Sequence, residues 1–171
     1  MSINLHSHNR GSLAKDQKDF LSKLVPLAIK VQEWTKLKSE FIGIDCPRGI
    51  LASIAIADII VETSWHSHPL SLPEVGNRYS NNLFLLEAGE HWKGKTNEHK
   101  GRKYRAYKDW ESASIDYTDY IVFSRLYDLP LLCRKDRDQL QALSISKPNY
   151  REWFQDTSHL IDLLNLTEFD E

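Results

Sequence analysis

Two carboxylates, Asp58 and Glu62, stand four residues apart in the stretch ADIIVETSWHS, residues 57–67. At this spacing they share one face of a helix. Apolar neighbours raise the pKa of a carboxyl group, and a second carboxylate nearby raises it further. A carboxylic acid that keeps its proton near neutral pH can protonate a glycosidic oxygen, which is a poor leaving group without a proton. The pair therefore indicates general acid catalysis.

The same pattern leaves two structural alternatives open. The carboxylates could meet an arginine or lysine across a helix interface, or they could face solvent at a helix end. The spacing of Asp58 and Glu62 alone does not separate these alternatives from catalysis.

The segment that positions the carboxylates predicts a buried helix. Residues 50–61, ILASIAIADIIV, are apolar on almost every side, which is typical of a central helix. We expect this helix to begin near Pro47, with Asp45 or Cys46 as its cap. Residues 67–82 are rich in Pro, Asn, Ser and Gly and predict a loop, so the carboxylates should lie where the helix meets that loop.

The rest of the chain predicts a mainly α (α+β) domain with a small two-stranded β-hairpin lobe. Helical spacing begins at Asp16, and Pro26 predicts a kink or restart in that helix. Short alternating segments predict the hairpin near residues 89–107, and Asp109 predicts a helix cap after it. Two further helices are expected over about 136–143 and 149–164. Residues 1–15 predict a flexible N-terminal segment, and residues 16–171 predict the folded domain.

Composition excludes several classes of protein. The chain has 171 residues, of which 41% are hydrophobic and 27% charged, and these values are typical of one ordered globular domain. The net charge is −2 without a long basic run, so we expect no nucleic acid partner. No stretch approaches the ~20 apolar residues of a membrane span, and we expect no membrane insertion. The N-terminus also lacks the apolar core of a signal peptide.

Metal and disulfide chemistry are not indicated. The seven histidines include no H-x-x-x-H pair, so we expect no metal ligands. Cys46 and Cys133 are too few for a disulfide framework, and the sequence leaves open whether they pair.

Several stretches follow one another in a recognisable order. They are FLSKLVPLAIKVQE (20–33), IAIADIIVETSWHS (54–67), NNLF (81–84), WKGKT (92–96), YRAYKDWESASIDYTDYI (104–121), KPNYREWF (147–154) and LIDLLNL (160–166). Together they resemble the bacterial endo-β-N-acetylglucosaminidases of glycoside hydrolase family 73, which cut peptidoglycan glycan strands. This resemblance implies a lysozyme-like helical domain with the small β lobe beside a groove. It also implies that Glu62 is the general acid.

The resemblance implies further catalytic groups in the β lobe. Glu98 is the nearest match to the family's second acid, with Glu87 and Glu90 as competitors and a solvated surface charge as the alternative. An aromatic side chain that assists the reaction corresponds to Tyr104 or Tyr107, with Tyr120 as a lesser candidate, and we take Tyr107 as the catalytic candidate. If no second carboxylate reaches the groove, the N-acetyl group of the substrate or a bound water would complete the chemistry.

Substrate-binding candidates follow from the same motifs. Asn81 and Asn82 match the family's Asn-Asn pair and should shape the groove floor, although a turn or cap residue is an alternative for Asn81. Trp65 and Trp92 are candidate platforms for a sugar ring, and core packing is an alternative for Trp65. The remaining substrate-binding candidates are Tyr104 and Tyr120.

The predicted function is hydrolysis of the β-1,4 bond between N-acetylglucosamine and N-acetylmuramic acid. We expect no cofactor, peptidoglycan glycan strands as the partner, a monomer, and action outside the cell or in the wall. A chain without a signal peptide could be phage-associated or trimmed. The sequence departs from the family at Asp58, where an amide is usual, and at residues 85–87, Leu-Leu-Glu, where Gly-Ile-Lys is usual. These departures leave two alternatives open: a non-catalytic peptidoglycan-binding or structural module of a phage or secretion assembly, and a lytic transglycosylase.

Overall fold

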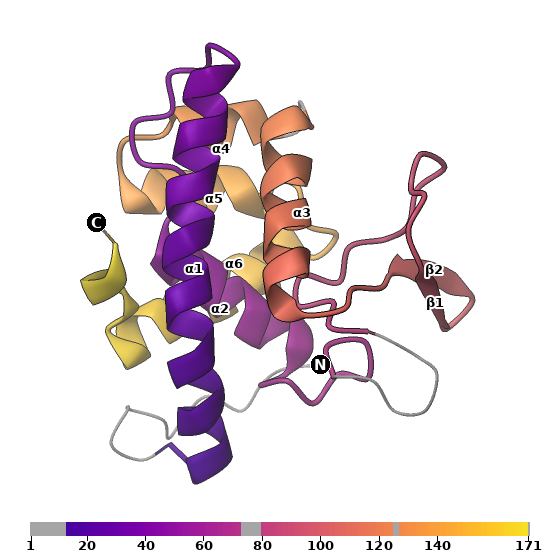
Figure 1. Cartoon of the computed structure of the whole chain (residues 1–171). Coiled ribbons are helices and arrows are strands. Elements are labelled where there is room, and N and C mark those ends of the chain that lie inside the picture. The colour runs from indigo at the N-terminus through magenta and orange to yellow at the C-terminus, as the bar shows by residue number, and fades with distance from the viewer. Residues whose placement is uncertain (1–12, 73–79, 125–126, 171) are drawn as a thin grey trace.

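The apolar run that carries Asp58 and Glu62 forms helix α2 (Ala52–Thr63), which is almost entirely buried. The computed structural model describes residues 13–72, 80–124 and 127–170, and α2 lies at the centre of the domain (Figure 1). The other elements in chain order are α1 (Lys15–Phe41), β1 (Thr96–His99), β2 (Arg102–Arg105), α3 (Trp110–Phe123), α4 (Asp128–Leu132), α5 (Asp136–Ser144), α6 (Tyr150–Leu164) and the 3₁₀ helix η3 (Leu166–Phe169). The predicted mainly α fold with a small β lobe is confirmed.

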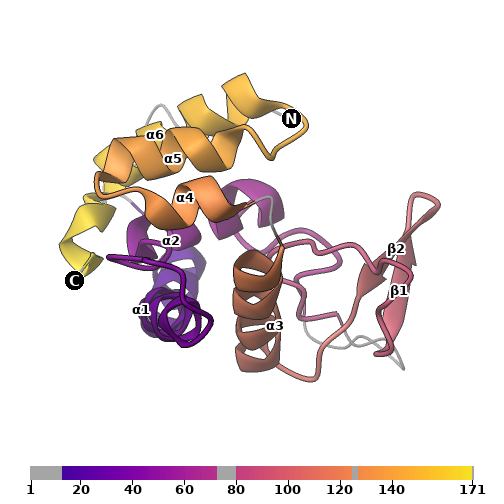
Figure 2. The ribbon, with the colours of Figure 1, turned by 90° about the horizontal axis from the view of Figure 1, so that it is seen from above.

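The helices form layers around α2. Helices α1 and α3 run side by side in the same direction (Figures 1 and 2), and an ion pair of 2.9 Å joins Lys30 of α1 to Glu111 of α3. Helix α2 packs against α1 on one side and against α6 and η3 on the other. The hairpin lies beyond α3, on the side away from α1 (Figure 2). The C-terminal end of α2 therefore lies inside the helical body rather than in the β lobe.

Helix α2 begins at Ala52, so the predicted start near Pro47 is wrong. Gly49 adopts a left-handed φ of 73°, which interrupts the chain before the helix. The amides of the first turn are then satisfied by side chains from distant elements: Gln139 accepts from Leu51 N, Gln32 from Ala52 N and Asp170 from Ser53 N. A local cap was expected because the sequence cannot show that partners far along the chain supply these acceptors.

Helix α1 runs through Pro26 as one continuous helix, so the predicted restart does not occur. Proline removes the amide that would bond the carbonyl four residues earlier, here that of Ser22. Both Pro26 and Ser22 are exposed, so water can reach the unpaired carbonyl.

The hairpin and the helix after it follow the prediction. Strands β1 and β2 pair antiparallel, and the turn between them uses Lys100 and Gly101 with φ values of 51° and 76°. Asp109 caps α3, because its carboxylate accepts a hydrogen bond of 2.7 Å from the amide of Ser112. The short helix α4 was not predicted. Residues 1–12 of the predicted flexible segment lie outside the described residues.

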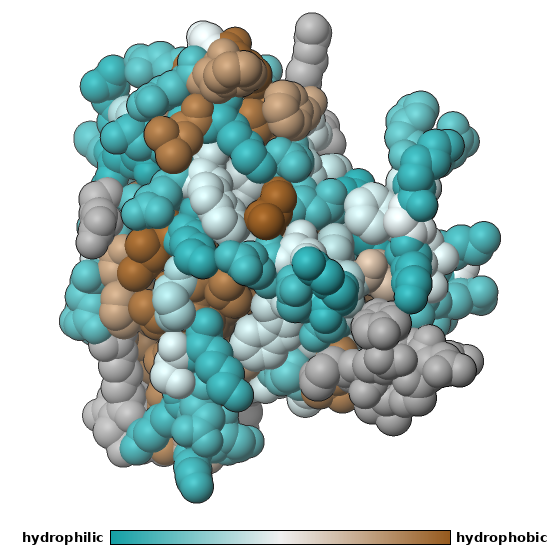
Figure 3. Space-filling view, in the orientation of Figure 1, coloured by the Kyte–Doolittle hydropathy of each residue, from teal (hydrophilic) through white to brown (hydrophobic). Residues whose placement is uncertain are grey.

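On the face drawn in Figure 3, polar residues alternate with apolar areas, one of which lies at the upper end of the molecule. Figure 3 shows apolar residues over the upper ends of α1 and α3, where Leu37, Phe41 and Phe123 are exposed. Within the described ranges, no helix combines the length and apolar character that crossing a bilayer requires.

Candidate active site

Glu62 lies in the last turn of α2, where the chain leaves the helical body. The three residues after the last helical residue, Thr63, are Ser64, Trp65 and His66, and all have left-handed φ values between 49° and 64°, which turn the chain sharply out of the helix. The Glu62 side chain keeps 28% of its surface exposed. Its Oε1 atom accepts a hydrogen bond of 3.1 Å from Nζ of Lys147, which lies between α5 and α6. A partly buried carboxyl group thus reaches solvent at the end of a buried helix.

Asp58 is the most buried charged group near Glu62, with 3% exposure. Its Oδ1 atom accepts hydrogen bonds from Lys147 Nζ at 2.7 Å and from the indole Nε1 of Trp153 at 2.8 Å. The structure therefore shows the alternative of a cation across a helix interface for Asp58, and the same Lys147 ammonium also contacts Glu62. Neither Lys147 nor Trp153 was identified from the sequence, because each lies more than 80 residues away from its partner.

The surroundings of Glu62 favour its protonated form. Burial is the largest influence and raises the pKa of Glu62, and the charge of Asp58 raises it further. The ammonium of Lys147 acts in the opposite direction, but the net pKa of Glu62 stays above its ordinary value. Glu62 therefore has the electrostatic character of a general acid, with one cation limiting how far its pKa rises.

A second cluster joins the β lobe to α3 around Arg105. The Arg105 guanidinium lies over the ring of Trp92 at 4.9 Å and over the ring of Tyr120 at 5.4 Å. It also forms an ion pair of 2.7 Å with Asp116. The structure thus brings together two substrate-binding candidates through a residue that was not among the candidates. The signal for Arg105 was its place in the YRAY motif.

Tyr107 belongs to this second cluster but is only 5% exposed. Its hydroxyl donates a hydrogen bond of 2.6 Å to Asp116, and its ring lies edge-on to Trp92 at 5.8 Å. Burial and the Asp116 carboxylate raise the pKa of Tyr107 well above its ordinary value, so the hydroxyl keeps its proton. The catalytic assignment of Tyr107 stays a prediction, and this geometry also allows a positioning role.

Tyr107→Phe separates these two roles. The variant removes the hydrogen bond from the Tyr107 hydroxyl to Asp116, and Asp116 keeps its ion pair with Arg105. We therefore expect a loss of about 1–2 kcal/mol in unfolding free energy. If Tyr107 only positions the lobe, the folded variant keeps glycan hydrolysis within about 10-fold of the parent. A loss beyond about 100-fold in a fully folded variant would instead assign the hydroxyl to the reaction. Urea unfolding and peptidoglycan digestion of the same sample measure both quantities.

The two asparagines hold the loop that precedes the lobe. Asn82 is fully buried; its Nδ2 donates to the carbonyls of Leu86 and Arg105, and its Oδ1 accepts from the amide of Leu86. Asn81 has a left-handed φ of 41° and donates to the carbonyl of Tyr107 at 3.1 Å. Both side chains thus fix the backbone on which Arg105 and Tyr107 stand.

The remaining candidates lie on the lobe and after α2. Glu98 is exposed on β1 and faces Lys103 across the hairpin, and Tyr104 of β2 is partly buried opposite Asn97. Trp65 is partly buried and packs against the hydrophobic core, in agreement with the alternative role of core packing. Among the described residues, no hydrogen bond or ion pair joins Glu98 to Glu62.

Tyrosines connect the two clusters. The ring of Tyr120 lies 5.6 Å from that of Tyr127 in an edge-on arrangement. Tyr127 is close enough to Lys147 for the ammonium to lower its pKa against the effect of burial, which is larger. The contact between Tyr120 and Tyr127 therefore links the Arg105 cluster to the surroundings of Lys147.

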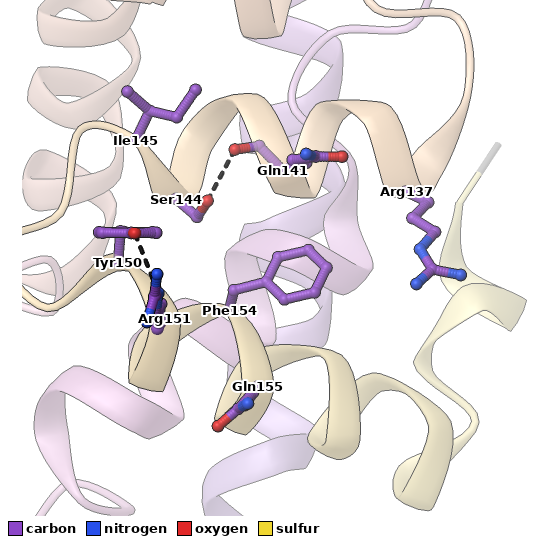
Figure 4. A pocket seen from close by; sticks show the side chains of 8 residues that line it. All are labelled: Arg137, Gln141, Ser144, Ile145, Tyr150, Arg151, Phe154 and Gln155. Atoms are coloured by element: carbon purple, nitrogen blue, oxygen red, sulfur yellow. Dashed lines mark hydrogen bonds between the residues drawn. The ribbon is translucent and has the colours of Figure 1, made fainter.

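Two hollows in the surface are lined by residues other than Glu62. Figure 4 shows one between α5 and α6, where Ile145, Tyr150 and Phe154 supply apolar surface and Arg137 and Arg151 supply charge. A second hollow contains Asn81 together with Phe20, His66 and Trp110. In the described part of the chain, no group of three or more His, Cys, Asp or Glu side chains is placed to hold a metal ion.

Comparison with known protein families identifies the family to which this chain belongs. A glucosaminidase family model, described as mannosyl-glycoprotein endo-β-N-acetylglucosaminidase, matches residues 44–166. No curated protein matches the sequence significantly.

Solved structures share the fold at low sequence identity. The catalytic domain of the autolysin Auto from Listeria monocytogenes is 15% identical with a TM-score of 0.65, and the match covers 93% of this chain and 90% of that one. A peptidoglycan hydrolase from Sphingomonas sp. A1 is 21% identical with a TM-score of 0.59, covering 85% and 92%. The glycoside hydrolase domain of FlgJ from Salmonella typhimurium is 20% identical with a TM-score of 0.54, covering 85% and 89%.

Proposed function

The chain belongs to the glucosaminidase family of glycoside hydrolases, and on this premise we propose that it hydrolyses the β-1,4 bond between N-acetylglucosamine and N-acetylmuramic acid in peptidoglycan. Similar folds named as an autolysin and as peptidoglycan hydrolases support this choice of substrate. The observation that carries the proposal is the partly exposed Glu62 carboxyl group at the end of buried α2, with its pKa raised by burial.

In the proposed mechanism Glu62 donates its proton to the bridging oxygen. The glycosidic bond then breaks as positive charge develops at the anomeric carbon and the ring oxygen. Protonation matters because the departing sugar would otherwise leave as an alkoxide. After departure of the leaving group, water adds to the anomeric carbon and Glu62 recovers a proton.

The group that stabilises the developing charge is proposed to be Glu98 or the acetamido group of the substrate. Glu98 stands on an exposed strand and is free of described ion pairs, so a bound glycan could contact it. The acetamido alternative needs no second carboxylate, because its carbonyl oxygen can approach the anomeric carbon from within the same sugar. Glu87 is a weaker candidate since its carboxylate pairs with Arg102 at 2.8 Å.

Sugar contacts are proposed along the lobe side of the site. Trp92 and Tyr120 present aromatic rings that are partly exposed and are held by Arg105. Tyr104 lies on strand β2, and Trp65 stands three residues after Glu62 in the chain. Asn81 and Asn82 contribute by fixing the loop rather than by contacting sugar through exposed atoms. We propose that the protein acts as a monomer outside the cell or within the wall.

Mass spectrometry of digested, purified peptidoglycan tests the proposal. Hydrolysis at the proposed bond gives fragments with N-acetylglucosamine at the reducing end. Anhydro-muramyl ends would instead identify a lytic transglycosylase. Binding to peptidoglycan without any new ends would identify a non-catalytic module, and either of these results would overturn the proposed reaction.

A further inference from the structure

Lys147 is the one cation that contacts both carboxylates of α2 within the described residues. Its Nζ atom lies 2.7 Å from Oδ1 of Asp58 and 3.1 Å from Oε1 of Glu62. The Lys147 side chain is 18% exposed and that of Asp58 is 4% exposed. Because water reaches this contact poorly, the arrangement of the three groups is set mainly by one another.

The lysine is held from several directions. Trp153 donates to the same Asp58 oxygen at 2.8 Å, and the Lys147 ammonium lies 5.0 Å from the centre of the Trp153 ring. The backbone is also fixed, since the amide of Lys147 bonds the carbonyl of Ser144 at 3.0 Å. Pro148 follows and restricts the conformation of Lys147 itself. These contacts hold the otherwise flexible Lys147 side chain in one position.

We propose that Lys147, held by Asp58 and Trp153, is a positioning residue for Glu62. The Lys147 ammonium donates a hydrogen bond to Oε1 of Glu62, so that the other carboxyl oxygen, Oε2, faces the substrate. The inference rests on the proposed function only where it assigns proton transfer to Oε2. The contacts between Lys147, Asp58 and Glu62 do not depend on that function. Within the described residues, Oε1 is the only Glu62 oxygen with a hydrogen-bond partner. A proton on Oε2 would therefore point away from the lysine.

The same geometry makes the titration of Glu62 depend on two charges of opposite sign. The Lys147 ammonium lowers the pKa of Glu62 and the Asp58 carboxylate raises it. The other titratable groups that face this site are Tyr117 of α3 and Tyr127 before α4, and burial raises the pKa of each. Both tyrosines stay neutral through the range in which Glu62 titrates. Trp153, from α6, has no titratable group.

Opposite shifts in two variants are the expected signature. With the cation removed in Lys147→Met, the pH midpoint of Glu62 rises by about 1 unit or more; with the anion removed in Asp58→Asn, it falls. A general acid works only in its protonated form, so the alkaline limb of the pH–rate profile should move up in the first variant and down in the second. We also expect kcat of Lys147→Met to fall about 10- to 100-fold with little change in KM, since Glu62 loses its fixed orientation.

The measurement is carbon-13 NMR of glutamate-labelled protein without substrate, with the Glu62 signal assigned by its absence in Glu62→Gln. Lys147→Met leaves Asp58 buried without its cation, so the double variant Asp58→Asn/Lys147→Met provides a neutral replacement whose midpoint should return toward that of the parent. Lys147→Arg keeps the charge and should keep the midpoint. Lys38→Met is the matched control, because it removes a lysine that pairs with Asp119 between α1 and α3.

The inference requires both shifts. A Glu62 midpoint that stays at the parental value in either Asp58→Asn or Lys147→Met would overturn the inference, as would shifts in the same direction. The NMR titration needs no glycan. If the midpoints move as expected and the parent still cleaves no peptidoglycan, the proposed function fails while the coupling of Lys147 and Glu62 stands.

Discussion

Glu62→Gln should reduce peptidoglycan hydrolysis by about 10²- to 10⁴-fold, which is the usual contribution of a general acid. The amide has the shape of the carboxyl group, and its oxygen can still accept from Lys147, but it has no acidic proton. Asp58 and Lys147 remain as a balanced pair. We therefore expect the unfolding free energy to change by less than about 1 kcal/mol. Reducing ends released from purified peptidoglycan, measured beside thermal unfolding, check both parts.

The control for this variant is Glu152→Gln, which changes an exposed glutamate in the first turn of α6. It should digest peptidoglycan like the parent. The parent should lose activity as pH rises through the raised pKa of Glu62, since deprotonation removes the acid form. Full activity of a folded Glu62→Gln variant would disprove the assigned role of this residue, whatever products the parent gives.

Asn82→Ala should cost roughly 3 kcal/mol of unfolding free energy, the largest stability loss that we expect from one polar side chain here. The change leaves the amide of Leu86 and the carbonyl of Arg105 without their partner, whereas the carbonyl of Leu86 loses one of two bonds and keeps the one from the amide of Arg105. Each unsatisfied buried group costs about 1–3 kcal/mol, and some regain a water molecule in the space that alanine opens. Urea unfolding followed by far-ultraviolet circular dichroism measures the difference.

Asn81→Ala is the comparison variant. Asn81 donates one hydrogen bond, to the carbonyl of Tyr107, so this variant should lose less unfolding free energy than Asn82→Ala. Asn82→Asp should be nearly as harmful as Asn82→Ala, since a carboxylate would face two carbonyl oxygens. If Asn82→Ala unfolds within about 0.5 kcal/mol of the parent, the side chain does not hold the loop, and its role would have to be sought in substrate contact.

Local patterns predicted the helices well wherever the decisive interactions were local. The apolar run 50–61 identified α2 as the central helix, and Asp109 was correctly predicted as the cap of α3, where its carboxylate accepts from the amide of Ser112. The hairpin near residues 89–107 was also predicted, and its turn contains Gly101, because glycine favours the φ that this turn needs. These features depend on residues only a few positions apart.

Features that depend on distant residues were missed. Asp58 and Glu62 were correctly placed on one face of α2, but their shared cation, Lys147, lies 85 or more residues away. Arg105 stood inside a quoted motif, yet nothing local indicated that Asp116, Trp92 and Tyr120 would surround it. A sequence shows which side chains can carry charge, whereas the pairing of those charges depends on how the helices pack.

The start of α2 also bears on the order in which the protein folds. Its first amides are bonded by Gln32 of α1, Gln139 of α5 and Asp170, which follows Ser53 by 117 positions. During synthesis the amide of Ser53 can gain this acceptor only after the chain has been extended to Asp170. Contacts at such separation slow the closing step of folding. The helix that carries Glu62 is thus expected to reach its final form late, together with the docking of the C-terminal segment.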